Sequence, residues 1–188
     1  MTKDYATLPV TEMRRSDRAV TDEIWIKALL HRAPVGYMAT MHGDQPFINS
    51  NIFVYDEANH IIYMHTARVG RTQANVHHHE KVCFTVTEMG RLLPADVALE
   101  FSVEYTGVMV FGTAVIVEDA AEATYGLQIL LDKYAPHLTP GKDYRPPVAE
   151  ELKRTAVYRI NIDKWSGKKK EVEADFPGAY LYENVTNN

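Results

Sequence analysis

Two arginines and two threonines stand close together in residues 66–72, directly after a β-rich stretch. Arg68 and Arg71 could each place paired hydrogen bonds on phosphate oxygens, and Thr66 and Thr72 could add hydroxyl donors. A helix that begins within this 66–72 loop would contribute backbone N–H groups, so the loop suits an anion. The chain has neither a Walker loop nor the Rossmann glycine fingerprint. The alternative interpretation is a solvated basic turn.

His65 immediately precedes this loop, on a strand face that it shares with Ile61 and Tyr63. Its imidazole could contact a ligand, although a strand histidine can also serve packing alone. The run 77–79 of three histidines does not predict a metal site, because consecutive helical residues point in different directions and no further ligand joins them at helical spacing. Cys83 lies in an apolar run, so we expect an unreactive thiol and no covalent acyl chemistry.

The loop follows a predicted β-hairpin with arms at 49–55 and 61–65 and a turn at 56–60. Extended back to residue 47, the first arm has an amide and aromatic face of Phe47, Asn49, Asn51, Phe53 and Tyr55. Its opposite face is expected to be core, with Ile48, Ser50, Ile52 and Val54. The first face could hydrogen-bond the edge of a heteroaromatic ring and cover its plane. Alternatively, it faces solvent with two ordinary asparagines.

The remaining elements follow from periodicity and turn residues. We expect helices at 21–31, 70–78 and 119–135, and Thr21 and Asp119 are the expected caps of the first and the last. Strands are expected at 35–41, 82–86, 102–117 and 156–162. Residues 88–100 are left unassigned, 138–147 are expected to form a loop, and 165–170 a tail. Gly107 and Gly112 are expected to bend or bulge the long strand. About six strands in hairpin order favour a mainly β fold, an antiparallel barrel with flanking helices, over a parallel α/β sheet.

Composition supports one folded domain. The 188 residues are 46% hydrophobic and 24% charged, which predicts a domain at 21–170, an N-terminal arm at 1–20 and a C-terminal tail at 171–188. A net charge of -5 argues against nucleic acid or an anionic membrane as partner. The single cysteine excludes an intrachain disulfide and a zinc-cysteine cluster. Without an apolar leader or membrane-length segment, the chain is expected to be cytoplasmic.

Short motifs in a fixed order resemble a known family. They are Met13-Arg14-Arg15-x-Asp17-Arg18, Gly36-Tyr37-Met38-Ala39-Thr40, Asn51-Ile52-Phe53-Val54-Tyr55-Asp56, Ile62-Tyr63-Met64-His65-Thr66-Ala67, Gly70-Arg71, Asn75, Val82-Cys83-Phe84, Ser102-Val103-Glu104-Tyr105, Phe111-Gly112 and Ser166-Gly167-Lys168. This set, spanning residues 13–170, resembles the 5-nitroimidazole-resistance (Nim) branch of the pyridoxamine 5'-phosphate oxidase-like flavoproteins.

The resemblance implies a split β-barrel homodimer with FMN, or FAD, at each of two subunit-interface sites. Residues along the isoalloxazine and ribityl would be Met38, Ala39, Thr40 and Asn51, and those around the phosphate would be Thr66, Ala67, Arg68, Arg71 and Thr72. The partner's Trp165 would complete the site, and His65 would face the substrate side. Thr106-Gly107 departs from the Arg-Ser often found there in the family. No arginine-rich C-terminal substrate segment is present, so pyridoxamine phosphate oxidation is not expected.

The function that this resemblance implies is a flavin-dependent oxidoreductase. NAD(P)H would reduce the flavin, which would reduce a 5-nitroimidazole, another nitroaromatic or another small oxidised acceptor. The alternatives are a non-catalytic flavin or haem carrier, a pyridoxamine 5'-phosphate oxidase-like enzyme, and a protein that holds another large cofactor such as a deazaflavin.

Overall fold

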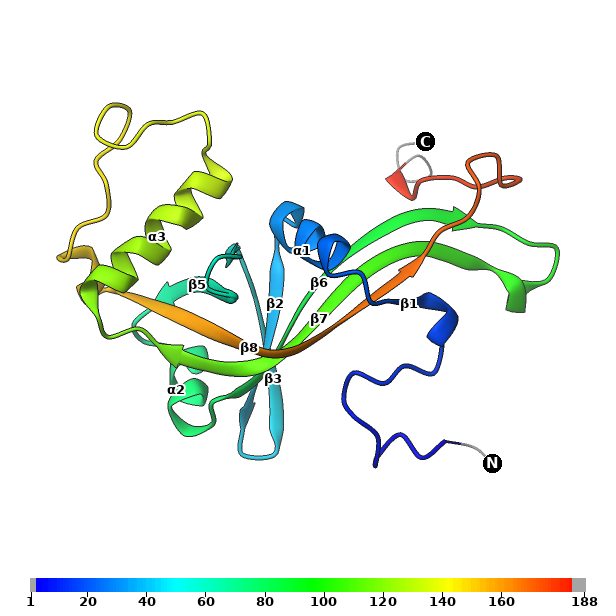
Figure 1. Ribbon diagram of the computed structural model, residues 1–188, viewed down its shortest axis with the longest axis horizontal. Helices are drawn as coiled ribbons and strands as arrows, with labels where there is room; N and C mark the ends of the chain where they lie inside the picture. The colour runs from blue at the N-terminus through cyan, green and yellow to red at the C-terminus, as the bar shows by residue number, and fades with distance from the viewer. Residues whose placement is uncertain (1–2, 184–188) are drawn as a thin grey trace.

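The fold is one antiparallel sheet of eight strands with three α-helices, seen in a computed structural model that describes residues 3–183 (Figure 1). The strands are β1 Ala19–Val20, β2 Gly36–His42, β3 Gln45–Asn51, β4 Phe53–Asp56, β5 Ile61–Ala67, β6 Lys81–Leu93, β7 Ser102–Ile116 and β8 Thr155–Lys170. The α-helices are α1 Glu23–Arg32, α2 Arg71–His78 and α3 Ala120–Tyr134, and the 3-10 helices are η1 Ser16–Arg18, η2 Ala98–Glu100 and η3 Glu151–Lys153. The mainly β, antiparallel prediction is confirmed.

The sheet is rolled rather than flat. Its strand order is β3-β2-β6-β7-β8-β5-β4, and β1 pairs with β8. The two edge strands, β3 and β4, are separated in the chain only by Ile52, so the edges meet there without a hydrogen-bonded ladder between them. The Asn51 side-chain amide also donates to the backbone carbonyl of His65 on β5, which ties the edge strand β3 to the strand next to the other edge. This arrangement is a split β-barrel.

Two apolar clusters hold the helices against the sheet. Ile26, Leu29 and Leu30 of α1 are buried in the main core together with inward-facing strand residues. Complete burial of a leucine contributes roughly 1.5–3 kcal/mol. A second cluster forms where α3 covers the other face of β5, and it includes Tyr63 and Leu130. The two faces of β5 are therefore both covered, one by the core and one by α3.

The expected single strand over residues 47–55 is wrong, because the chain breaks at Ile52 into β3 and β4. Alternation does not continue across the break, since all four residues of β4 are buried between the core and α3. Ile48, assigned to the core face, is 65% exposed, whereas Phe53, assigned to the ligand face, is completely buried. The face assignment therefore fails at both ends of the segment.

Two strands are longer than expected. β6 continues through much of the unassigned stretch, and β8 includes residues 165–170, which were expected to be a tail. The reason is strand pairing that no local sequence pattern reveals. On one side, Gly167 and Lys168 pair with Val20 and Ala19 of β1. On the other side, they pair with Val108 and Gly107 of β7. A lysine-rich stretch is thus kept extended by neighbours on both sides.

Helix caps and glycines give mixed outcomes. Asp119 caps α3 as expected, because its carboxylate accepts the Glu122 N–H at 2.7 Å. α1 is capped by Asp22, not Thr21, since a carboxylate one residue later reaches the free N–H groups of the first turn. Gly112 lies at a register shift between β7 and β8, as expected, whereas Gly107 occupies a regular ladder position.

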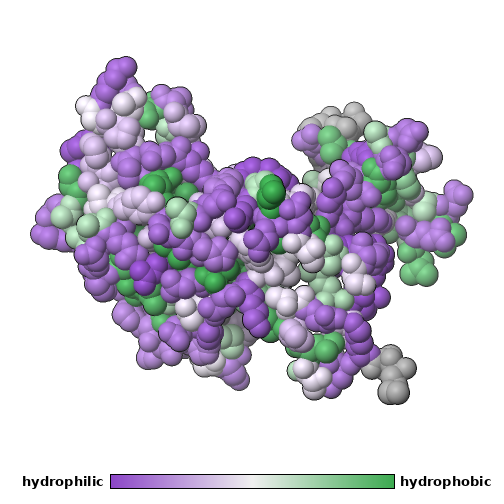
Figure 2. All heavy atoms as spheres, viewed as in Figure 1, coloured by the Kyte–Doolittle hydropathy of each residue, from purple (hydrophilic) through white to green (hydrophobic). Residues whose placement is uncertain are grey.

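The β6–β7 hairpin extends away from the barrel, and a C-terminal segment runs beside its end (Figure 1). Arg91 and the largely buried Glu104 form a bidentate ion pair across this hairpin, with both N–O distances at 2.8 Å. Arg91 also donates to the carbonyls of residues 172–174, and the Val172 N–H donates to Glu104 at 3.0 Å. The pair therefore fastens the C-terminal segment to the hairpin. Figure 2 shows that the surface in this view is mostly hydrophilic, with smaller hydrophobic areas.

No helix within residues 3–183 combines the length and the apolar character needed to cross a membrane.

Candidate functional site

The 66–72 loop joins β5 to α2, and its helical end presents hydrogen-bond donors. α2 begins at Arg71 after Gly70, and in the described part of the chain no side-chain cap hydrogen bond forms at this N-cap. The Thr72 side chain is buried at this turn, while Arg71 is exposed beside it. Free backbone donors at the positive end of the helix dipole, with a guanidinium alongside, attract a phosphate.

A buried amide fixes α2 against β2. Asn75 is completely buried, and its Nδ2 donates to Thr40 Oγ1 at 2.9 Å. Its Oδ1 has no hydrogen-bond partner within the described part of the chain. Asn75 was not among the predicted site residues. The available signal was its position three residues after Thr72, on the same helical face.

Arg68 lies on the other side of the loop. Its guanidinium is 4.0 Å from the Glu118 carboxylate, and its backbone N–H donates to the Arg154 carbonyl at 3.1 Å. The buried Nε of Arg68 has no hydrogen-bond partner among residues 3–183. Arg68 lines a cavity of about 220 Å³ near α3, which neither Arg71 nor Thr72 lines. The structure thus does not bring the two arginines to a single pocket.

The three predicted residues of β2 point in different directions. Met38 and Thr40 are buried, with exposed fractions of 0% and 2%, so their side chains belong to the core. Ala39 is half-buried on the outward face, where it pairs with Ile48 of β3. A ligand on the outward face would therefore meet Ala39 rather than the side chains of its neighbours.

Asn51 and Thr66 are already engaged within the chain. Asn51 donates to the His65 carbonyl and accepts the following backbone N–H at 2.8 Å. Thr66 Oγ1 shares a hydrogen bond with the Tyr158 hydroxyl at 3.0 Å and donates to the Ala67 carbonyl at 2.9 Å. These side chains position the end of β5, and their remaining hydrogen-bonding capacity is small.

Trp165 lies at the opposite end of β5 from the loop. Its ring packs edge-on against His60, with centroids 4.6 Å apart, and against Tyr55 at 6.2 Å. His60 precedes the start of β5, whereas the 66–72 loop follows its end. Within one chain, Trp165 therefore does not join the 66–72 loop.

His65 is half-buried on the face of β5 that α3 covers. It lines a cavity of about 340 Å³, whose other walls are Leu127, Leu130, Leu131, Pro147, Glu151, Arg154 and Thr155. Its Nδ1 is buried without a hydrogen-bond partner in the described chain. Burial lowers the pKa of His65 below its usual value, so the imidazole is neutral near pH 7. A neutral imidazole can accept a hydrogen bond or bind a metal ion.

A third feature is an uncovered apolar area on the outward face of the sheet. Tyr37 on β2, Ile48 on the neighbouring β3 and Met109 on β7 are 39%, 65% and 43% exposed. The register connects them, since Tyr37 pairs with Thr85 and Thr85 pairs with Met109. Thr85 lies between Tyr37 and Met109, so this face is apolar with a polar residue within it. Exposed apolar side chains gathered on one face are typical of an interface.

These observations define a split-barrel protein in which an uncapped helix start, flanked by Arg71 and Thr72, follows one strand end. The family model for pyridoxamine 5'-phosphate oxidase matches residues 22–169. The chain therefore belongs to the pyridoxamine 5'-phosphate oxidase-like family. No curated protein is significantly similar to it.

Solved structures share the fold. The flavocytochrome Anf3 from Azotobacter vinelandii is 26% identical, with a TM-score of 0.75 over 92% of this chain and 84% of that one. A FAD- and haem-binding protein from Mycobacterium smegmatis is 21% identical, with a TM-score of 0.72 over 90% and 80%. A Bacteroides thetaiotaomicron protein named for 5-nitroimidazole antibiotic resistance is 18% identical, with a TM-score of 0.66 over 81% and 90%.

Proposed function

We propose that this chain is a flavin-dependent oxidoreductase that takes electrons from NAD(P)H and reduces a small oxidised acceptor, such as a nitroaromatic of the 5-nitroimidazole type. The observation that carries the proposal is the uncapped start of α2 with Arg71 and Thr72 beside it. Family membership and the flavin-binding character of the flavocytochrome and of the Mycobacterium protein support a flavin as the ligand.

The residues present fit the phosphate end of FMN or FAD. Arg71 would neutralise the phosphate, Thr72 would donate its hydroxyl, and the first N–H groups of α2 would add directed donors. When bound, the flavin supplies hydride and electron transfer. The neutral imidazole of His65 would donate a hydrogen bond or a proton to the acceptor. The neutral ring can donate its N–H hydrogen bond as it is, whereas proton transfer would first require His65 to take up a proton, which its lowered pKa disfavours near pH 7.

We also propose that two copies of the chain complete the site. Trp165 does not reach the 66–72 loop of its own chain, and the face that carries Tyr37, Ile48 and Met109 is open. Dimerisation through this face would cover the apolar surface and bring the partner's Trp165 toward the ligand. Light scattering at micromolar concentration should give twice the chain mass, and a flavin-loaded monomer would refute a shared site.

The first test identifies the bound cofactor by mass and then compares two arginine variants. Arg71→Ala should weaken flavin binding by about 1.5–3 kcal/mol, roughly 10- to 150-fold in Kd, the scale of a lost charged hydrogen bond. Arg68→Ala is the matched control, because Arg68 points to the Glu118 side of the loop and should have the smaller effect. Wild-type flavin affinity in Arg71→Ala would overturn the assignment of the phosphate site.

A second candidate function is haem binding. The chain would bind haem in addition to flavin, or would carry haem without catalysing a reaction. The observation that favours it is His65, a neutral imidazole with an unpartnered Nδ1 in a cavity walled by Leu127, Leu130 and Leu131. Two similar structures are named for haem together with flavin. A Soret band that disappears in His65→Ala but persists in the exposed control His78→Ala would support it. Purified protein that takes up flavin but shows no Soret band after haem is supplied would exclude it.

A further inference from the structure

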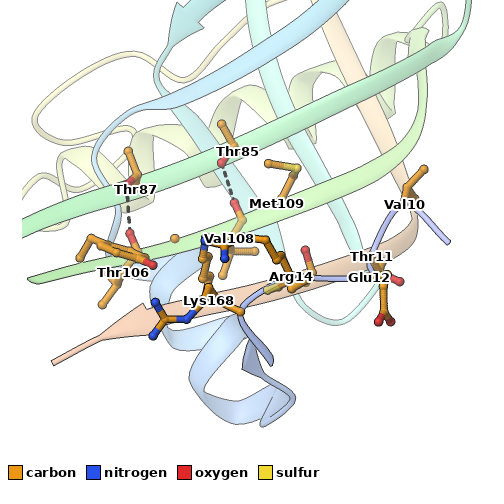
Figure 3. Close-up of a pocket in the computed structure, with 15 residues that line it drawn as sticks. Val10, Thr11, Glu12, Arg14, Thr85, Thr87, Thr106, Val108, Met109 and Lys168 are labelled. Atoms are coloured by element: carbon orange, nitrogen blue, oxygen red, sulfur yellow. Dashed lines mark hydrogen bonds between the residues drawn. The ribbon is translucent and has the colours of Figure 1, made fainter. Parts of the chain in front are cut away.

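Within the described chain, the β6–β7 hairpin has a covered end and an uncovered end. Near the barrel, residues 10–15 of the N-terminal arm lie along its outward face (Figure 3). At the far end, where η2 joins the two strands, Val97, Leu99 and Phe101 are 55%, 92% and 56% exposed. Figure 2 shows hydrophobic side chains at this end of the molecule, on the right of the view. Residues 96–101 are called the hairpin tip below.

The hairpin tip and the segment beside it are acidic. Residues 92–102 and 171–183 together contain six carboxylates and no lysine or arginine. The exposed carboxylates that have no ion-pair partner among residues 3–183 are Asp96, Glu100, Glu173 and Asp175. The apolar side chains of the tip are therefore surrounded by negative potential, which attracts a basic surface.

The hairpin is firmly supported although its residues 88–106 belong to neither apolar cluster of the barrel. A two-stranded ribbon is only marginally stable by itself. Here the Arg91–Glu104 pair fastens the C-terminal segment to the hairpin, and Leu92 and Tyr180 exchange two backbone hydrogen bonds at 2.7 and 3.1 Å. A surface on a fixed support loses little conformational entropy when a partner binds to it. These supports suit an element that presents its end to a partner.

Charge distinguishes the possible occupants of the tip. The carboxylates would repel nucleic acid and the anionic surface of a membrane. A tip-to-tip contact between two copies would bring the same carboxylates together, and like charges across an interface cost free energy. A protein segment with apolar residues flanked by lysine or arginine would instead pair with the carboxylates and cover Leu99 and Phe101.

We infer that the hairpin tip docks a basic amphipathic segment of another protein. Apolar side chains of the partner would lie against Val97, Leu99 and Phe101, and its cations would face the carboxylates around them. A small contact of this kind is weak, dependent on salt and steered by charge. The inference does not depend on the proposed oxidoreductase function, so either can fail without the other.

The experiment measures binding of a fluorescently labelled synthetic amphipathic helix of leucine and lysine to the purified protein by anisotropy. The double variant Leu99→Asn/Phe101→Asn should raise the Kd about tenfold or more, because it removes the apolar contact. Asp96→Asn/Glu100→Gln should also raise the Kd at low salt, and it should reduce the dependence of Kd on salt. All four side chains are exposed, so both variants should melt at the wild-type temperature.

Two matched controls lie outside the hairpin. Ile24→Asn replaces an apolar residue of α1 that is 79% exposed. Asp44→Asn/Glu80→Gln removes two exposed carboxylates elsewhere on the surface. Both controls should bind the peptide as the wild type does, because a site at the tip does not involve these residues.

Wild-type affinity in both tip variants, or an equal loss in the controls, would overturn the inference. Equal binding of a peptide with glutamate in place of lysine would overturn it too, because charge would then play no part. If the tip variants convert a dimer to a monomer in light scattering, the tip is an interface between copies and the inference is wrong. Binding to phosphatidylcholine vesicles that the tip variants abolish would assign the tip to lipid instead.

Discussion

The replacement Gly36→Ala tests the packing at the start of β2, the strand that carries Met38 and Thr40. An added Cβ at Gly36 would lie 2.1 Å from Phe84 Cζ and 3.0 Å from Phe53 Cδ1. Both rings are completely buried and pack edge-on with centroids 4.9 Å apart, so neither has space to withdraw. Overpacking of this kind costs about 3 kcal/mol, and the lower entropy of the unfolded chain returns about 0.5–1 kcal/mol.

We therefore expect Gly36→Ala to lower the free energy of unfolding by about 2 kcal/mol. Phe84→Leu alone should cost about 1.5 kcal/mol through the space that it leaves. In the double variant the new methyl group occupies part of that space, so the two losses should not add. The coupling should be about 2 kcal/mol in favour of the double variant.

The assay is urea unfolding followed by circular dichroism and tryptophan fluorescence for the four members of this cycle. Equal m-values would show that the change lies in stability and not in the extent of unfolding. Losses that add to within about 0.5 kcal/mol would refute the reasoning, because they would mean that the methyl group and the Phe84 ring do not compete for space.

Two further predictions concern the long hairpin. Hydrogen bonds from Arg91 and from the Val172 N–H lower the pKa of Glu104 to about 2, below its ordinary 4.5. The ionised Glu104 should therefore stabilise the fold above pH 4.5, and this stabilisation should be lost as the pH falls toward 2. Glu104→Gln should flatten the acid limb of the unfolding free energy, and an unchanged limb would contradict this. Gly112→Ala should lower the melting temperature strongly, since its Cβ would lie 2.0 Å from the Asn161 carbonyl oxygen. Gly107→Ala should leave the melting temperature nearly unchanged, because its Cβ would be 3.5 Å from the nearest atom. Similar melting temperatures for the two variants would refute this expected difference.

Local signals in the sequence were sufficient for features that depend on neighbouring residues. The cap at Asp119 needs only the first turn of α3. The glycine signal was correct at Gly112 but wrong at Gly107 of the same strand, because a bulge also depends on the register of the paired strand. The assignment of Ile48 to the core is wrong because the chain breaks at Ile52, which local alternation does not show. The assignment of residues 165–170 to a tail is wrong because they pair with β1 and β7, which lie far away in sequence. Tertiary pairing overrides local propensity in such cases.

The candidate site shows the same division. The helix start at Arg71 and Thr72 is formed by consecutive residues, so the sequence predicted its position without help from the rest of the fold, and its anion binding stays a prediction. The direction of the Arg68 side chain depends on Glu118 and α3, and the burial of Asn75 depends on its contact with Thr40 of β2. No spacing along the chain encodes those contacts, so only coordinates reveal them.

The position of β8 between β7 and β5 sets the order in which the molecule can be assembled during synthesis. β5 ends at Ala67 and β7 at Ile116, but the strand that both require begins only at Thr155. A nascent chain therefore carries two incomplete half-sheets with open edges until its last long strand is made. Pairings so distant in sequence are intrinsically slow to form, and open edges invite intermolecular pairing. Expression yield should accordingly depend on temperature and chaperone supply more than the stability of the finished fold would suggest.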